Sequence, residues 1–263
     1  MKKYYLLMIF SAMFIFLLLL TNCNDSLSPC QSKIDTVYKY INLGAGLIAY
    51  YPFDGDSKDY SGFSHDGINY GSAHYITGHN KLAIAFNGFF ERGYVKVSNT
   101  NVLKIFENRF TFACWLRRDE KGGTDINGNY STSNGLHCIF AKGSDRNGFF
   151  SGLGNYADST VLFGSLVRSW NNQEWYAKIS NDYKLGDWFH WAIVNTGNKI
   201  KIYVNSKLVT DVDAVLDMES SRDRDLYIGR FEFDYYPFKG AIDEFYIYNR
   251  ALNEDEIVAL YHK

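Results

Sequence analysis

The chain has 263 residues, of which 27 are basic and 29 acidic, so its formal net charge is −2. A charge this close to zero lacks the excess of Lys and Arg that binds phosphates, and it argues against nucleic acid as a partner. Aromatic residues make up 17% of the chain, which favours strands over helices.

The N-terminus has the pattern of a targeting segment. Two lysines precede an apolar run over 4–20, as in a secretory signal peptide, although a run of this length also suffices for an uncleaved membrane anchor. The four residues that end at Cys23, LTNC, resemble a bacterial lipobox. We therefore expect a signal peptide over 1–22, lipid attachment at Cys23, and an extracytoplasmic protein anchored by lipid in a bacterial membrane, with the outer-membrane surface as one candidate location.

A tether and one domain follow. Residues 23–44 are polar at their start, and Gly44 and Gly46 mark the boundary of a domain over 45–263. Predicted strands cover 47–53, 83–86, 93–97, 110–117, 137–142, 160–166, 175–180, 188–195, 200–204, 207–209, 226–228 and 241–248. Many short strands with almost no helical periodicity predict an all-β sandwich or barrel of antiparallel sheets.

Two local signals mark a turn and a helix. Asn205 and Ser206 separate two predicted strands, which indicates a tight hairpin. Asn253, followed three residues later by Glu256, predicts a capping box and a short C-terminal helix. We expect this helix to pack on one end of the sandwich.

The last predicted strand contains an unexpected acid. Apolar residues occupy both alternating phases of 241–248, which predicts a strand covered on both faces. By strict alternation Asp243 shares a face with Ala241, Phe245 and Ile247. A carboxylate that faces a core costs several kcal/mol unless it is paired or hydrogen-bonded, so we expect a compensating partner.

Cysteine usage leaves one pairing open. Cys114 and Cys138 fall on two successive predicted strands, and in an oxidising compartment they can form a disulfide. Two buried free thiols are an equal alternative.

Several motifs recur in order along 47–261: LIAYYPFDG at 47–55 with DYSG at 59–62, FNG at 86–88 with YV at 94–95, FTFACWL at 110–116, WFHWA at 188–192 with IYVN at 202–205, LYIG at 226–229, and GAIDEFYIYNRAL at 240–252. Together they resemble the bacterial laminin-G-like domains of the concanavalin A-like lectin/glucanase superfamily. The resemblance implies a jelly-roll sandwich of two antiparallel sheets with a short C-terminal helix. It also implies that the first and last strands lie close together.

The same resemblance suggests a structural Ca²⁺ ion. Ca²⁺ takes six to eight oxygen ligands from carboxylates, amides and backbone carbonyls. The expected set is Asp54, Asp59, Asn87, Gly88 and Asp243. The alternative is that Asp54 and Asp59 cap turns and that Asp243 accepts backbone N–H bonds.

Carbohydrate binding is the second expectation. Sugars stack their C–H faces on aromatic rings while polar groups bind the hydroxyls. The segment WNNQEWY at 170–176 has this composition at a predicted turn, and another aromatic lies in the loop before the last strand. The expected contact residues are Trp170, Asn172, Trp175, Tyr176 and Tyr235. The alternative is that these aromatics serve packing.

An enzymatic reading is less favoured. Glu232 and Asp234 place two acids on one face of an extended segment, whereas the laminarinase- and lichenase-type hydrolases of this superfamily use Glu-x-Asp-x-(x)-Glu. Tyr236 and Pro237 stand where the second Glu belongs, so the motif is broken. We expect a non-catalytic module whose partner is a glycan or, as the alternative, an extracellular or cell-surface protein in an adhesion role.

Overall fold

The computed structural model describes residues 41–100, 109–120, 123–124, 130–131, 135–144, 147–156, 159–168, 171–178, 184–213, 223–232 and 236–263. The expected signal peptide, the lipid attachment at Cys23 and most of the tether lie outside these residues. Those assignments and the domain boundaries stay predictions. Within the described residues, none of the helices has the length and apolar character needed to cross a bilayer.

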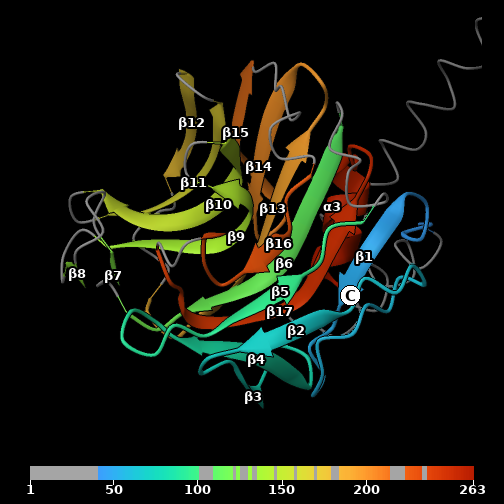
Figure 1. Ribbon diagram of the computed structural model, residues 1–263. Helices are drawn as coiled ribbons and strands as arrows, with labels where there is room; N and C mark the ends of the chain where they lie inside the picture. The colour runs from blue at the N-terminus through green and yellow to red at the C-terminus, as the bar shows by residue number, and fades with distance from the viewer. Residues whose placement is uncertain are drawn as a thin grey trace, which may run out of the picture.

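The chain forms two antiparallel sheets that face one another (Figure 1). Sheet A has the order β15 (Lys207–Asp213), β14 (Lys199–Val204), β13 (Trp188–Asn195), β6 (Phe110–Arg118), β17 (Lys239–Tyr248), β4 (Leu82–Asn87) and β3 (His74–Thr77), with β1 (Leu47–Tyr51) also paired to β17. Sheet B has the order β12 (Asn171–Lys178), β11 (Ser159–Arg168), β10 (Asn147–Tyr156), β9 (Leu136–Ser144), β16 (Leu226–Ile228), β5 (Tyr94–Val97) and β2 (Gly67–Tyr70). The short strands β7 (Gly123–Thr124) and β8 (Tyr130–Ser131) join it at β9.

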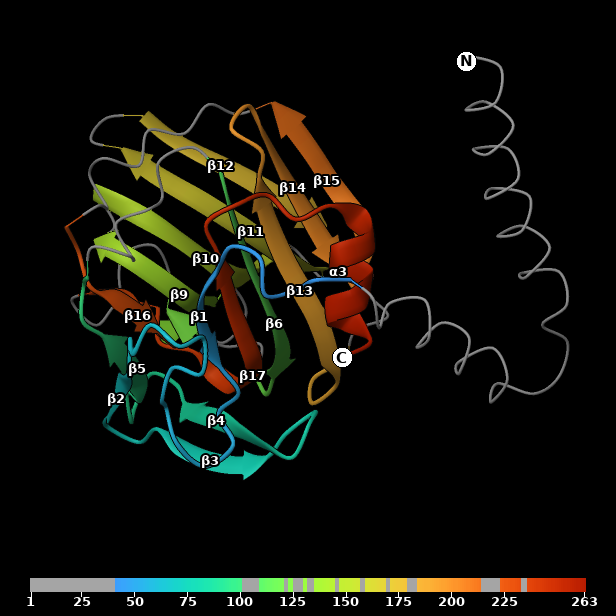
Figure 2. The same cartoon turned by 90° about the vertical axis from the view of Figure 1, so that its right-hand side faces the viewer.

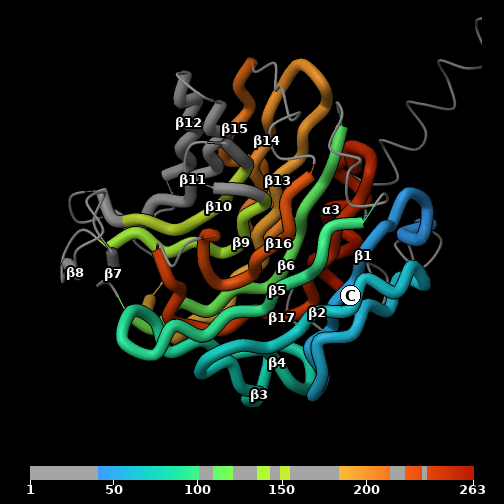
Figure 3. The backbone as a smooth tube through the Cα atoms, viewed as in Figure 1, coloured from blue at the N-terminus to red at the C-terminus, as the bar shows by residue number. Residues whose placement is uncertain are grey.

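The main core lies between the sheets and is rich in phenylalanine. Phe112 of β6 stacks on Phe140 of β9 with ring centroids 4.3 Å apart, and Phe245 of β17 lies 5.4 Å from Phe140. These side chains come from both sheets, so the aromatic residues that favour strands also join the two layers. The predicted all-β sandwich is confirmed, and β1 lies beside β17 as expected (Figure 3).

The C-terminal helix α3 (Glu254–Tyr261) has the predicted capping box between Asn253 and Glu256. It buries Ile257 and Leu260 against Tyr203 and Tyr248, which point out of sheet A. The helix therefore covers the outer face of sheet A instead of an end of the sandwich (Figure 2). The prediction was wrong because the outward side chains of sheet A are themselves apolar and need a cover.

The structure has strands that the sequence did not predict, namely β2, β3, β7, β8 and β10. β10 contains Gly148, Gly152 and Gly154, which are unfavourable in isolated strands, but it pairs along its length with β9 and β11. The segment predicted as a turn near Trp175 belongs to β12, which pairs with β11 from Asn171 onward. In both segments, pairing with neighbouring strands outweighs local preference.

The two cysteines do not form a disulfide. Cys114 lies on β6 in the core between the sheets, and Cys138 lies on β9 in a separate cluster with Phe231. Both are buried and free, and burial raises the pKa of each thiol well above its usual value. They behave as small apolar residues, as the alternative stated.

The predicted hairpin at Asn205 and Ser206 is confirmed and joins β14 to β15. Both residues have positive φ, 47° and 63°, which is the conformation of a type I′ turn. Asn205 also ties the turn to β13, because its side chain accepts the backbone N–H of His190 at 2.8 Å.

The turn predicts opposite effects for two substitutions. Ser206→Gly should raise the free energy of unfolding by about 0.5 kcal/mol, because glycine adopts the left-handed conformation without strain. Ser206→Val should lower it by about 1 kcal/mol or more, since a branched side chain is disfavoured there. Urea unfolding of both variants checks this, and shifts in the same direction would contradict the turn geometry.

Candidate functional site

β17 carries a β-bulge at its centre. The two residues between Asp243 and Tyr246 lie opposite a single residue, Cys114, on β6. Within the bulge Glu244 has a φ of 52°, a left-handed conformation that costs a non-glycine residue about 1–3 kcal/mol. Bulges of this kind redirect side chains and are frequent at functional sites.

The bulge changes which face each side chain of β17 occupies. Ile242, Phe245 and Ile247 point into the core between the sheets, while Tyr246 and Tyr248 pack under α3. The prediction that Asp243 shares a face with Phe245 and Ile247 was therefore wrong, because the extra residue shifts the alternation by one. Asp243 instead lies opposite Trp115 of β6, on the outer side of sheet A.

The bulge also sits at a gap beside β17. β4 pairs with β17 as far as Ile242, and β1 pairs with it from Phe245 onward. The turn between β3 and β4 closes over this gap, and Asp243 Oδ2 accepts the backbone N–H of Asn80 at 2.8 Å. Gly78 permits this approach, because a Cβ there would lie 2.5 Å from Asp243 Oδ2.

A second carboxylate holds the same turn from the other side. Asp54, which follows β1, accepts the backbone N–H of Leu82 at 3.1 Å and the Lys81 ammonium at 2.7 Å. The segment after β1 and the centre of β17 therefore meet at this turn, which Asp54 and Asp243 both bind.

Asp243 is fully buried and incompletely hydrogen-bonded. Among the described residues its Oδ1 has no hydrogen-bond partner. Burial raises the pKa of this carboxyl to about 7, against the opposing effect of the Asn80 N–H and with a further increase from the Glu244 charge. Asp243 therefore changes its protonation state near neutral pH.

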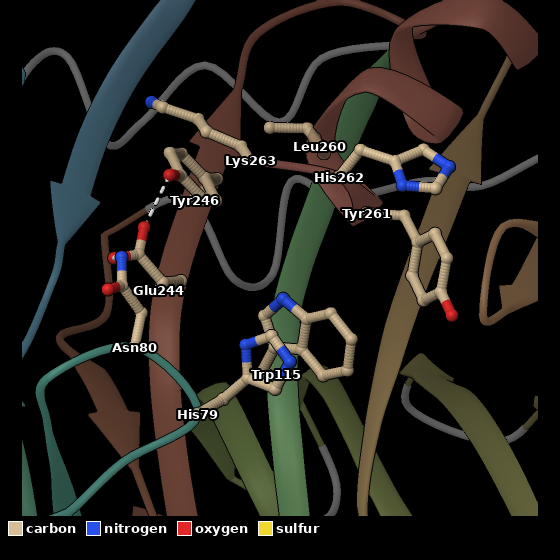
Figure 4. Close-up of a pocket in the computed structure, with 9 residues that line it drawn as sticks. All are labelled: His79, Asn80, Trp115, Glu244, Tyr246, Leu260, Tyr261, His262 and Lys263. Carbon is tan, nitrogen blue, oxygen red and sulfur yellow. Dashed lines mark hydrogen bonds between the residues drawn. The ribbon is translucent and has the colours of Figure 1, made fainter. Parts of the chain in front are cut away.

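Next to the bulge is a cavity of about 440 Å³, within the range of roughly 300–1,000 Å³ typical of small-molecule sites. It lies between β17, β6, the β3–β4 turn and the end of α3 (Figure 4). Its lining residues are His79, Asn80, Trp115, Glu244, Tyr246, Leu260, Tyr261, His262 and Lys263.

The polar end of the pocket is centred on Glu244. Its Oε2 accepts the hydroxyl of Tyr50 at 2.7 Å and that of Tyr246 at 2.5 Å, and its Oε1 accepts the Asn80 amide at 3.2 Å. Glu244 keeps 9% of its surface exposed, so the bulge places an oriented carboxylate at the pocket wall.

The other end of the pocket is aromatic. The His79 ring stacks on Trp115 with centroids 3.4 Å apart, and Tyr261 of α3 stacks on the same indole at 5.4 Å. His190 on β13 lies edge-on to Trp115, and burial lowers its pKa to about 3, so it is neutral at physiological pH. Aromatic side chains at one end and a carboxylate with an amide at the other suit a small polar ligand that also has apolar faces.

None of the residues that line this pocket was predicted as a site residue from the sequence. Trp115, Glu244 and Asn80 were assigned no binding role. The available signal was the pair Asp243–Glu244 inside an apolar strand, since strict alternation would bury one of the two acids against the core. Two adjacent acids in such a strand indicate a bulge.

The residues proposed for Ca²⁺ do not meet at one site. Asn87 donates to Glu91 at 2.7 Å and, with Gly88, lies at the far end of β4 from Leu82, about 17 Å away along the strand. Within the described residues, no group of three or more His, Cys, Asp or Glu side chains is placed to hold a metal. Calcium binding stays a prediction, which melting with and without a chelator tests.

Asp59, the remaining member of that set, closes a loop beside β1. Its carboxylate accepts the N–H groups of Tyr50, Ser61 and His65 at 2.8–3.0 Å. Burial raises the pKa of Asp59, but these donors outweigh it and hold the pKa below its usual value. Asp54, Asp59 and Asp243 thus make the backbone contacts that the alternative described.

Of the residues proposed to contact sugar, Trp170 and Tyr235 lie outside the described residues. Asn172, Trp175 and Tyr176 lie on β12, the edge strand of sheet B, and not in a turn. Binding of sugar by these residues stays a prediction.

The buried carboxylate predicts an unusual pH dependence of stability. The pKa of Asp243 is about 7 in the folded chain and about 3.9 in the unfolded chain. Between about pH 4 and pH 7, Asp243 is therefore protonated in the folded state and ionised in the unfolded state. The free energy of unfolding should fall as pH rises from about 4 to about 7, by at most about 1.4 kcal/mol per pH unit. Asp243→Asn removes this loss, so its stability relative to wild type should increase over that window.

Asp54→Asn is the matched control, measured by urea unfolding across the same pH series. Although burial raises the pKa of Asp54, the Lys81 ammonium and the Leu82 N–H outweigh it and keep the carboxyl ionised. That variant should differ from wild type by a constant amount above about pH 5. Parallel curves for wild type and Asp243→Asn would contradict the buried titration.

Three solved structures with the same fold contain two domains that bind ligands or partners. Domain 4 of AbnA, a GH43 extracellular arabinanase from Geobacillus stearothermophilus, in complex with arabinotriose, has a TM-score of 0.62 at 20% identity, over 81% of this chain and 97% of that chain. The binding domain of botulinum neurotoxin DC with rat synaptotagmin II has a TM-score of 0.63 at 16% identity, over 84% of this chain and 52% of that chain. The same toxin domain in complex with SialylT has a TM-score of 0.61 at 16% identity, over 83% of this chain and 51% of that chain.

This chain spans about half the length of the toxin binding domains, and at these identities the likeness shows the fold alone. No curated protein matches the chain in sequence. The family model described as concanavalin A-like lectin/glucanases superfamily, of the laminin G type, matches residues 89–258, which is more than half of the chain. The chain belongs to this family.

Proposed function

We propose that this protein is a non-catalytic binding module for a glycan, held outside the cytoplasm by a lipid at Cys23. The observation that carries the glycan assignment is the pocket beside the β17 bulge. It combines the aromatic stack of His79, Trp115 and Tyr261 with hydrogen-bonding groups on Glu244 and Asn80. A sugar ring presents the same combination of C–H faces and hydroxyls.

Complexes of structurally similar domains support this proposal. The AbnA domain is described in complex with arabinotriose and the toxin domain with SialylT, so the fold accommodates saccharide ligands in those proteins. The toxin domain is also described in complex with synaptotagmin II, which makes a protein partner the alternative. The location outside the cytoplasm depends on the N-terminal sequence, and mass spectrometry of the mature N-terminus tests it.

The acidic side chains of the pocket favour a binding role over hydrolysis. Glycoside hydrolysis needs two carboxyl groups about 5–10 Å apart across the scissile bond. Among the described lining residues Glu244 is the single acidic side chain. Asp243 lies next to it but is fully buried and binds the turn at Asn80. We therefore assign Glu244 to ligand binding.

A glycan array tests both the function and the site. Wild type should bind at least one glycan, and Glu244→Gln should weaken that binding about tenfold or more, because a hydrogen bond to a charged group is lost. Trp175→Ala on β12 serves as the control and should leave binding unchanged.

Three other outcomes would change the assignment. Loss of binding only in Trp175→Ala would move the site to β12. Binding to no glycan would contradict the glycan assignment and favour the protein-partner alternative. Turnover of an oligosaccharide by wild type would contradict the non-catalytic assignment.

A further inference from the structure

A cation of the chain itself lies near the two tyrosines at the polar end of the pocket. The Lys263 ammonium lies 5.1 Å from the ring centroid of Tyr50 and 4.9 Å from that of Tyr246. Both distances fall within the range of about 6 Å over which a cation is attracted to an aromatic ring. The two rings are parallel with centroids 4.4 Å apart, and the ammonium lies nearly equidistant from them.

The charge at this end of the pocket favours a cation. The hydroxyls of both tyrosines donate to Glu244, which places the carboxylate at the edge of the stacked rings. Among the described residues Glu244 forms no ion pair, and the nearby Lys81 is bound to Asp54. The carboxylate is 9% exposed, so solvent screens it only partly.

We propose that the polar end of the pocket is an ammonium site that recognises the protonated amine of an amino sugar, and that Lys263 occupies it in the free protein. The proposal rests on the glycan-binding function proposed above and names the class of sugar. A sugar is favoured because the aromatic stack of His79, Trp115 and Tyr261 lies at the opposite end of the same pocket. One ligand can therefore place its ring at one end and its amine at the other.

The chemistry separates a free amine from its acetylated form. A protonated amine has three N–H donors and a positive charge, which suit the carboxylate of Glu244 and the stacked tyrosine rings. An acetamido nitrogen is neutral and has one N–H, so it gains little from either group. It also cannot replace the attraction that Lys263 loses when it leaves.

Lys263 acts as an internal competitor in this arrangement. The sugar amine binds only to molecules in which Lys263 has moved away from the two tyrosines. The fraction of molecules in which Lys263 stays there therefore lowers the apparent affinity for the sugar. Lys263 is exposed, and its replacement leaves the folded core intact. Lys263→Met should therefore strengthen the binding of an amino sugar, whereas the loss of an ordinary ligand contact would weaken it.

Isothermal titration with two oligosaccharides of equal length tests the proposal, one of glucosamine units and one of N-acetylglucosamine units, at a pH at which the amine is protonated. Wild type should bind the glucosamine form about tenfold more tightly. Lys263→Met should strengthen that binding about threefold. Glu244→Gln should abolish the preference between the two forms.

Tyr50→Leu gives a second test that leaves Glu244 in place. It removes one of the two rings near the ammonium and should also reduce the preference for glucosamine. Melting curves of all three variants should show a folded transition, so that a change in preference reports the site.

Equal affinity for the two oligosaccharides, or weaker glucosamine binding by Lys263→Met, would overturn the proposal. If neither oligosaccharide binds but the array identifies another glycan, the amino-sugar assignment fails and the glycan-binding function stands. If no glycan binds at all, both fail.

Discussion

The structure depends on one irregularity, the left-handed backbone of Glu244 in the β17 bulge. β17 is a central strand that pairs with β6 along one edge and with β4 and then β1 along the other. The bulge lies between the part of β17 that pairs with β4 and the part that pairs with β1. β17 can therefore pair with both strands along one edge while it pairs with β6 along the other. The strain at Glu244 persists because these three strands fix the backbone on both sides.

The bulge also connects the fold to the candidate site. It turns Asp243 toward the β3–β4 turn, which carries His79 and Asn80, and it turns Glu244 toward the hydroxyls of Tyr50 and Tyr246. The helix α3 then completes the pocket, since Tyr261 packs on Trp115. Elements far apart in the chain thus meet around a two-residue segment, and the pocket forms only when the sandwich has closed.

The sequence predicted the fold well because its signals are local or shared with a family. Alternation identified strands such as β6 and β13, the Asn205–Ser206 turn and the Asn253 cap were correct, and β1 lies beside β17. The same alternation wrongly placed Asp243 on the face of Phe245 and Ile247, because one extra residue reverses the face of every later side chain. β10 was missed since its pairing partners, and not its glycines, determine its conformation.

The candidate site was harder to predict, because its residues come together only in the folded chain. Trp115 and Tyr261 lie far apart in the sequence, and the FTFACWL motif that contains Trp115 indicated the fold and not a binding site. Asp243 was recognised as a carboxylate that needs compensation, but its partner is the backbone N–H of Asn80 in a turn that no motif marked. Composition selected the aromatic segment near Trp175 instead, and that segment is part of an edge strand.

The most direct test of this account is a crystal structure of the protein with the glycan that it binds most tightly. We expect the sugar to lie against Glu244 and Trp115, with Glu244 at positive φ and the Lys263 ammonium displaced from Tyr50 and Tyr246. A sugar bound on β12, or a β17 that runs through Glu244 without a bulge, would contradict the account.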